Sequence, residues 1–216
     1  MLNNIRIEDY EAQLKSFNKD FCVKYLPSGC TVYDIGAFRG VLTVEFAKLG
    51  YNVIAIEGSE RNFGYLQDNT KEFPNVTCIL SAISNENKSV VTRFNDCIGL
   101  EHPPQPIRYI TLPDLIKEQG WPNPTMIKMD IEGIETMALH ACHDLIYNVR
   151  PFWQLSVHET PEHSAQCVYD NFPGFVHKDK GGFDFNEFFT AGYTVLDFDL
   201  KPVTSIGGFN EYFLIP

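Results

Sequence analysis

The chain has 216 residues, and its 17 Lys and Arg against 28 Asp and Glu give a formal net charge of −11 at pH 7. This length suits one domain with a substantial core, and a 44% hydrophobic share is ordinary for a globular protein. The acidic balance repels a phosphate backbone, which argues against a nucleic-acid substrate. The N-terminal segment lacks the apolar core of a signal peptide, and no run is long enough to span a bilayer, so we expect a cytoplasmic protein.

The spacing of the cysteines also indicates a cytoplasmic protein. The six cysteines include no CxxC pair, which a zinc or redox motif would need. We therefore expect free thiols in a reducing compartment. The cysteines are Cys22, Cys30, Cys78, Cys97, Cys142 and Cys167.

The first half of the chain alternates apolar strands with amphipathic helices. In chain order we expect a polar helix at 7–19, a strand at 31–35, a helix at 41–49, a strand at 52–56, a helix at 60–69 and a strand at 76–80. Strands that are apolar on both faces and alternate with helices indicate a parallel sheet covered by helices.

The second half is less regular. In chain order we expect a strand at 89–95, a proline-rich loop at 96–108, a helix at 112–119, a strand at 125–130, a helical stripe from Ile134 to Leu145, a strand at 152–158, an insertion or lid at 161–183, a helix at 186–191, and strands at 193–198 and 209–215. No repeat or linker is visible. The sequence therefore predicts a single α/β domain over 1–216, a doubly wound Rossmann-like sheet with helices on both faces, and residues 1–30 of this domain form an N-terminal helical extension.

A glycine turn follows the first strand in TVYDIGAFRG. Gly36 and Gly40 flank it, and Glu57 ends the next strand, where an acid can accept hydrogen bonds from ribose hydroxyls. This arrangement fits a dinucleotide or S-adenosylmethionine, or else a turn that only joins a strand to a helix. A dinucleotide-binding turn requires a second glycine at the position of Phe38. In addition, the carboxylate of Asp34 suits a cationic ligand better than a phosphate. We therefore favour S-adenosylmethionine.

At this point the chain resembles the class I methyltransferases, and more narrowly the FkbM family of S-adenosylmethionine-dependent methyltransferases. The resemblance lies in three blocks: YDIGAFRGVLT, VIAIEGSERNFGYLQDN and IKMDIEGIE. Phe38 stands where the family usually has Asn, and Gly58 and Ser59 replace a common Pro-Asn pair. The resemblance implies a seven-stranded, mostly parallel sheet with the last strand antiparallel, and methyl transfer to an oxygen of a sugar or small hydroxylated metabolite.

The glycine turn and the resemblance together give a set of expected cofactor-binding residues. They are Asp34, Gly36, Ala37, Phe38, Gly40, Thr43, Glu57, Gly58, Ser59, Asn62 and Ala82.

Charged residues end the strand at 125–130. Strand alternation puts Lys128 and Asp130 on one face, where the two charges can pair. We expect Asp130 to be functional, because a carboxylate at the end of a central strand has few structural uses. We expect Lys128 to orient the acids rather than to react itself. Glu132 fits a structural and a functional role equally well, and Glu135 suits the start of a helix, where acids complement the dipole.

His158 and Glu159 end the next strand at the same edge. An imidazole of near-neutral pKa could take the proton of an acceptor hydroxyl, although a histidine at a strand end is often only structural. Asp130, His158 and Glu159 could instead hold a divalent cation. We name Asp130, His158, Glu159, Lys128 and Glu132 as the catalytic candidates and expect no metal.

The acceptor is the least constrained part of the prediction. The insertion at 161–183 mixes aromatic and hydrogen-bonding residues, which suits a sugar ring, but its aromatics could equally anchor it on the core. Two other functions stay open. One is a catalytically inactive cofactor-binding or scaffold module on the same fold, and the other, less favoured by the charge, is a nucleic-acid methyltransferase.

Overall fold

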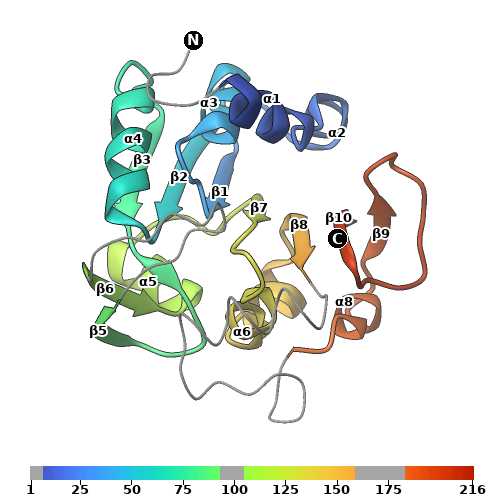
Figure 1. Cartoon of the computed structure of the whole chain (residues 1–216). Helices are drawn as coiled ribbons and strands as arrows, with labels where there is room; N and C mark the ends of the chain where they lie inside the picture. Colours follow the sequence, from blue (N-terminus) through green and yellow to red (C-terminus); the bar gives the residue numbers. More distant parts are fainter. Residues whose placement is uncertain (1–6, 93–104, 159–182) are drawn as a thin grey trace.

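A seven-stranded sheet forms the centre of the molecule (Figure 1). The computed structural model describes residues 7–92, 105–158 and 183–216. The strand order is β3-β2-β1-β7-β8-β10-β9, parallel except for β10, which is antiparallel to β8 and β9. The predicted mostly parallel sheet with an antiparallel last strand is confirmed. Its strands are β1 (Thr31–Ile35), β2 (Asn52–Glu57), β3 (Val76–Leu80), β7 (Met126–Met129), β8 (Phe152–His158), β9 (Thr194–Asp197) and β10 (Phe209–Ile215).

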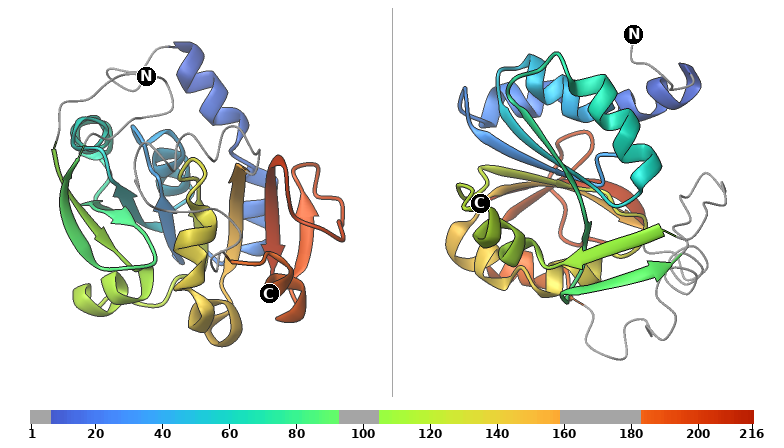
Figure 2. Two further views of the ribbon diagram at one scale, coloured as in Figure 1. Left: turned by 60° about the horizontal axis from the view of Figure 1, so that its bottom comes forward. Right: turned by 90° about the vertical axis from the view of Figure 1, so that its left-hand side faces the viewer.

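Helices cover both faces of this sheet, as the right-hand view of Figure 2 shows. One face carries α1 (Ile7–Lys15), α2 (Lys19–Tyr25), α3 (Val41–Lys48) and α4 (Glu60–Thr70). The other carries α5 (Leu112–Gln119), α6 (Glu135–His140), the π-helical turn η1 (Leu145–Val149) and α8 (Asn186–Thr190). Strand alternation assigns the side chains to these layers. Val32 and Val53 pack with α3, whereas Tyr33 and Ile54 belong to the core on the opposite face.

The N-terminal extension contains two helices, which corrects the predicted single helix at 7–19. The break lies at Asn18, whose side chain accepts a hydrogen bond of 2.9 Å from the backbone N–H of Phe21. Asparagine is a preferred N-cap residue, because its side chain satisfies a backbone donor that has no partner within the helix. Asn18 therefore starts a second helix instead of continuing the first.

A second, three-stranded sheet of order β4-β6-β5 corrects the predicted loop at 96–108. Its strands are β4 (Ala82–Ile83), β5 (Lys88–Thr92) and β6 (Gln105–Ile110). Ile107 and Tyr109 of β6 are 2% exposed and pack against Ala82 and Met137. Pro106 hid this strand from the sequence analysis, because proline is rare inside a sheet. Residues 93–104 of the predicted loop lie outside the described residues, as does the predicted strand beyond Thr92.

The remaining expectations have mixed outcomes. The cysteines within the described residues, Cys22, Cys30, Cys78 and Cys142, are free thiols, while Cys97 and Cys167 lie outside this part of the chain. Of the predicted insertion at 161–183, only Phe183 is described, and its ring packs in the core against Phe188. Among the described helices, none is long and apolar enough to cross a membrane.

Candidate functional site

The six parallel strands of the described sheet, which include β1, β2, β7 and β8, direct their carboxyl ends to one edge. The sheet order makes β1 the neighbour of both β2 and β7, so the chain reverses its direction of growth between β1 and β7. In open α/β sheets, ligands bind in the crevice outside the carboxyl ends of the strands at such a switch point. The described site residues at the carboxyl ends of β1, β2, β7 and β8 are therefore brought to a single edge.

The glycine turn after β1 is held by its surroundings. Gly36 and Gly40 have φ of +74° and +86°, in the left-handed region that favours glycine. A Cβ on Gly36 would lie 1.9 Å from the backbone oxygen of Asp130, and one on Gly40 would lie 2.8 Å from Leu66 Cδ1. Both glycines are thus required by close packing within the protein. Ala37 between them is buried, and its N–H donates to Ile56 O at 3.0 Å.

Phe38 also adopts the left-handed region, with φ of +52°. This conformation is uncommon for residues other than glycine and is several-fold enriched in asparagine. It therefore explains why a related turn would favour Asn at this position. The guanidinium of Arg39 lies 4.9 Å from the ring centroids of both Phe38 and Tyr65, and Asn69 donates to Arg39 O at 2.9 Å. Contacts from α4 hold this strained turn.

Glu57 joins the two loops at the ends of β1 and β2. Its Oε2 accepts the N–H of Phe38 and its Oε1 accepts the N–H of Ser59, both at 2.8 Å. Burial raises the pKa of Glu57 to about 7, against the lowering effect of these two backbone donors. An ionised carboxylate offers about four acceptor positions. Each oxygen of Glu57 therefore keeps acceptor capacity beyond the backbone bond that it makes.

The neighbours of Glu57 have structural contacts. Ser59 Oγ accepts the N–H of Asn62 at 3.4 Å and caps α4, and the side chain of Asn62 lies 3.5 Å from Arg39 Nε. Gly58 lies between Glu57 and this cap. Ala82 begins β4, 7% exposed, against the second sheet. The N–H of Ser81, which precedes Ala82, donates to Glu57 O at 3.0 Å, so the segment after β3 lies beside the end of β2.

Asp34 is fully buried and carries its own counter-ion. Thr43 Oγ1 donates to Asp34 Oδ2 at 2.6 Å, and Lys128 Nζ lies 3.1 Å from Asp34 Oδ1. Lys128 Nζ also donates to Gly36 O at 2.8 Å and lies 3.9 Å from Asp130 Oδ2. The sequence predicted a Lys128–Asp130 pair, but the closer partner is Asp34. With no exposed surface, Asp34 acts on the turn through Lys128.

The ammonium group of Lys128 is held in its charged form. Burial by itself would lower the pKa of Lys128, but the charges of Asp34 and Asp130 raise it overall. Lys128 therefore positions the backbone of the glycine turn through Gly36 O and neutralises the buried carboxylate of Asp34.

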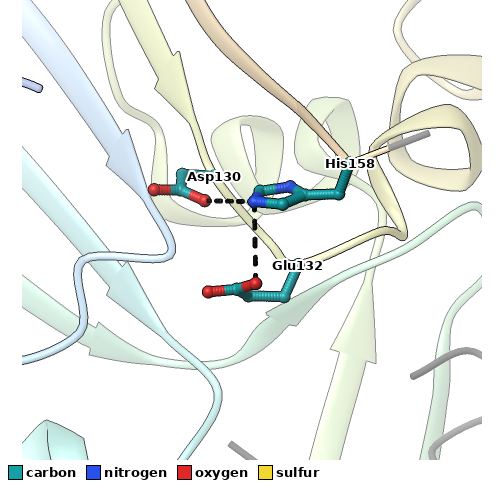
Figure 3. A group of neighbouring side chains, drawn as sticks. All are labelled: Asp130, Glu132 and His158. Atoms are coloured by element: carbon teal, nitrogen blue, oxygen red, sulfur yellow. Dashed lines mark ion pairs between the residues drawn. The ribbon is translucent and has the colours of Figure 1, made fainter. Parts of the chain in front are cut away.

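Three side chains gather where β7 and β8 end (Figure 3). His158 Nε2 lies 3.7 Å from Asp130 Oδ1 and 3.6 Å from Glu132 Oε2, so both carboxylates face the same ring nitrogen. The side chains of Asp130 and Glu132 are 31% and 47% exposed, whereas that of His158 is 8% exposed. Glu159, the fifth catalytic candidate, lies outside the described residues.

The other ring nitrogen of His158 contacts Glu135. Glu135 Oε1 lies 3.0 Å from His158 Nδ1 and also accepts the N–H of Ile131 at 3.1 Å. The N–H of Gly133 donates to the same carboxylate. We expected Glu135 only to start a helix, and it does begin α6. The sequence does not predict the contact of Glu135 with His158, since only the short spacing in IEGIE indicates that this side chain returns to the strand end.

Three carboxylates decide the charge of His158. Burial by itself would lower the pKa of this imidazole. Its hydrogen bond to Glu135 and the charges of Asp130 and Glu132 outweigh that effect and raise the pKa to about 9. In this arrangement the ring is protonated at neutral pH. An imidazole with a raised pKa is poorly matched to the expected role of taking a proton from an acceptor hydroxyl, and a catalytic role of His158 stays a prediction.

Comparison with known proteins bears on the fold. No protein-family model matches the chain, and no curated protein sequence matches it. Among solved structures, the FkbM methyltransferase of Methylobacillus flagellatus KT has a TM-score of 0.58 and 18% identity over 93% of this chain and 47% of that chain. This chain thus spans about half the length of that protein. The sheet order and the antiparallel last strand are those of the class I methyltransferase fold.

Two further structures are similar at lower scores. The precorrin-6y C5,15-methyltransferase of Geobacter metallireducens GS-15 has a TM-score of 0.47 and 15% identity, covering 98% of this chain and 89% of that chain. The fibrillarin of Aeropyrum pernix, in complex with natively bound S-adenosyl-L-methionine, has a TM-score of 0.46 and 11% identity, covering 94% of this chain and 72% of that chain.

Proposed function

We propose that the protein is an S-adenosylmethionine-dependent methyltransferase that methylates a hydroxyl oxygen of a sugar or a small hydroxylated metabolite. The class I methyltransferase fold supports methyl transfer as the general reaction. A fold alone does not determine chemistry, so the proposed reaction depends on the residues at the carboxyl edge of the sheet.

The position of Glu57 carries the proposal. Backbone N–H groups of Phe38 and Ser59 hold its two carboxylate oxygens between the loops that follow β1 and β2. An acid in this place can accept hydrogen bonds from both hydroxyls of a ribose, because each oxygen has acceptor capacity left. We propose that the cofactor's ribose binds here and its adenine lies toward Ala82, beyond β3.

The charges at the edge favour S-adenosylmethionine over a dinucleotide. The side chain of Phe38 stands where a dinucleotide-binding turn needs a second glycine for the pyrophosphate. Next to that turn, the partly exposed groups at the end of β7 are the carboxylates of Asp130 and Glu132. These acids would repel a pyrophosphate and attract the sulfonium and amino groups of S-adenosylmethionine.

The acceptor would bind at the group formed by Asp130, Glu132 and His158. When bound, S-adenosylmethionine supplies an electrophilic methyl group on its sulfonium. We propose that the two carboxylates and the imidazole orient the acceptor hydroxyl toward the space above the glycine turn. With no ion bound, the raised pKa of His158 favours the protonated ring at neutral pH, so it would hold position and charge and not act as a base. Lys128 fixes the turn itself through its hydrogen bond to Gly36 O.

Calorimetry tests the cofactor assignment. The purified chain should bind S-adenosylmethionine and S-adenosylhomocysteine, whereas NAD should not bind. Glu57→Ala should weaken the binding of S-adenosylhomocysteine by about 1–3 kcal/mol, the usual cost of leaving polar groups without partners. Asp68→Asn removes an exposed acid from α4 and should leave the affinity unchanged. Binding of NAD without binding of either sulfur compound would overturn the proposal.

A methyl-transfer assay separates the enzyme from the alternatives. The assay offers sugars, small hydroxylated metabolites and RNA as acceptors, and we expect transfer to a hydroxylated small molecule. Asp130→Asn should lower turnover at least about 100-fold while S-adenosylhomocysteine still binds, as expected when a group acts only on the reacting atoms. Persistent inactivity of a chain that binds the cofactor would indicate a scaffold module. Salt-dependent binding and methylation of RNA would indicate the nucleic-acid alternative.

A further inference from the structure

The group at the ends of β7 and β8 has the composition of a metal site. Asp130, Glu132 and His158 each offer one ligand atom, and these atoms all lie within 4.8 Å of one another. Two carboxylate oxygens and one imidazole nitrogen suit divalent transition metals such as Mn²⁺, Fe²⁺ and Zn²⁺ better than Ca²⁺, which takes oxygen ligands. From the sequence we expect no metal, and the alternative metal group that it suggests contains Glu159, whereas the structure brings Glu132 into the group.

The separations leave room for an ion. An ion bound at about 2.1 Å from two ligands separates them by about 3.0 Å at a right angle and about 3.6 Å at 120°. His158 Nε2 lies 3.7 Å from Asp130 Oδ1 and 3.6 Å from Glu132 Oε2, both longer than a good hydrogen bond. Figure 3 shows the two carboxylates facing this nitrogen from different directions, as ligands around one ion would.

The contact on the far side of the ring is independent support. Metal-binding histidines commonly donate their other ring N–H to a carboxylate, which fixes the tautomer and the ring orientation. Glu135 is 3% exposed and lies 3.0 Å from His158 Nδ1. Backbone N–H groups of Ile131 and Gly133 hold the Glu135 carboxylate in place. This arrangement points Nε2 toward Asp130 and Glu132.

Access from solvent completes the site. Glu132 adopts φ of +60°, an uncommon conformation for a residue other than glycine, and its side chain is 47% exposed. An ion can therefore enter from the side of Glu132 and Asp130, while His158 closes the inner side. Three protein ligands leave coordination positions open, as catalytic metal sites do.

We propose that Asp130, Glu132 and His158 bind one divalent transition-metal ion, which displaces the proton of His158 Nε2 to solvent, and that this ion holds the hydroxyl oxygen of the methyl acceptor. The second half of this proposal rests on the proposed methyltransferase function, but the binding of the ion does not. A bound cation also lowers the pKa of a coordinated hydroxyl, which would release its proton to solvent and leave the oxygen ready for methylation.

Titration with MnCl₂ tests the site directly. Calorimetry and the electron paramagnetic resonance signal of free Mn²⁺ should both report about one bound ion per full-length chain, without any cofactor present. Glu132→Gln and Asp130→Asn should each weaken binding at least ten-fold. Both side chains are partly exposed, so the variants should keep the circular dichroism spectrum of the wild type. Asp199→Asn, which removes an acid that is 69% exposed, should bind Mn²⁺ like the wild type.

Each outcome decides the proposal. No stoichiometric binding of Mn²⁺ to the wild type would overturn it, and so would equal affinities of the wild type and Glu132→Gln, since the ion would then bind elsewhere. The group would in either case be an ion pair between protonated His158 and its acids. The binding of S-adenosylhomocysteine is measured separately, so failure of the metal site would not refute the cofactor site, and failure of the cofactor site would not refute the metal site. A chain that binds Mn²⁺ but not S-adenosylhomocysteine would refute the proposed function and support the metal site.

Discussion

Removing the ammonium group of Lys128 should destabilise the protein strongly. Lys128 and Asp34 are 4% and 0% exposed, and their charged atoms lie 3.1 Å apart. In Lys128→Met the carboxylate of Asp34 stays buried with the hydroxyl of Thr43 as its hydrogen-bond donor, and Gly36 O loses its donor. Breaking a buried ion pair by removing one partner costs about 3–5 kcal/mol, because an uncompensated charge remains.

Urea denaturation followed by circular dichroism measures this loss. A total stability of about 5–15 kcal/mol leaves the variant folded but marginal. For a chain of this size, each kcal/mol shifts the melting temperature by about 2–4 °C, so Lys128→Met should melt roughly 6–20 °C below the wild type. The large loss of stability is expected because the Lys128–Asp34 pair is buried, so an exposed ion pair serves as the control. Lys48, paired with Glu45, has a side chain that is 51% exposed, and Lys48→Met should change stability by at most about 0.5 kcal/mol.

The double variant Asp34→Asn/Lys128→Met separates the charge effect from lost packing. Replacing both charges removes the uncompensated carboxylate, so the double variant should be more stable than Lys128→Met alone. A loss below about 1 kcal/mol in Lys128→Met would refute the reasoning. So would strict additivity of the two single substitutions, because residues in direct contact should couple.

Three further predictions concern the same region and its surroundings. Gly36→Ala should lower the free energy of unfolding, measured by urea denaturation, by more than about 3 kcal/mol, because its Cβ would lie 1.9 Å from Asp130 O. Gly50 has φ of +82° and nothing within 4 Å of the position that a Cβ would take, so Gly50→Ala should cost only about 1–2 kcal/mol. Equal losses in the two variants would contradict this prediction. The raised pKa of Glu57, about 7 against the ordinary 4.5, means that the native state binds more protons than the unfolded state between these values, so stability should fall as the pH rises from about 4.5 to 7. Glu57→Gln should lose that part of the pH dependence, and an unchanged slope would refute the assignment. Thr111→Ala removes the N-cap of α5 and should cost about 1 kcal/mol, measured in the same way.

Much of the fold follows from local patterns in the sequence. The strands β1, β2, β7 and β8 were predicted within a residue or two, because each is a short apolar run between turn-forming residues. Alternation of these strands with helices indicated a parallel sheet, whose carboxyl ends share one edge. That edge was enough to nominate Glu57, Asp130 and His158 as neighbours of a ligand.

Local patterns failed where a segment's state depends on distant neighbours. Pro106 disguised β6, which forms because Ile107 and Tyr109 bury their side chains in a second sheet that the sequence analysis did not predict. The N-terminal helix ended earlier than its polar pattern indicated, because Asn18 can cap a new helix.

The sequence by itself determined which chemical groups lie at the carboxyl edge, since strand ends can be found from apolar periodicity. Only the tertiary structure decided the partners of those groups. The register of β1 against β7 pairs Asp34 with Lys128, and the turn after β7 returns Glu135 to His158. These contacts set the charge on each group, because the electrostatic energy of a buried group depends on its nearest neighbours and its exposure to water. Neither quantity can be obtained from the order of the residues alone.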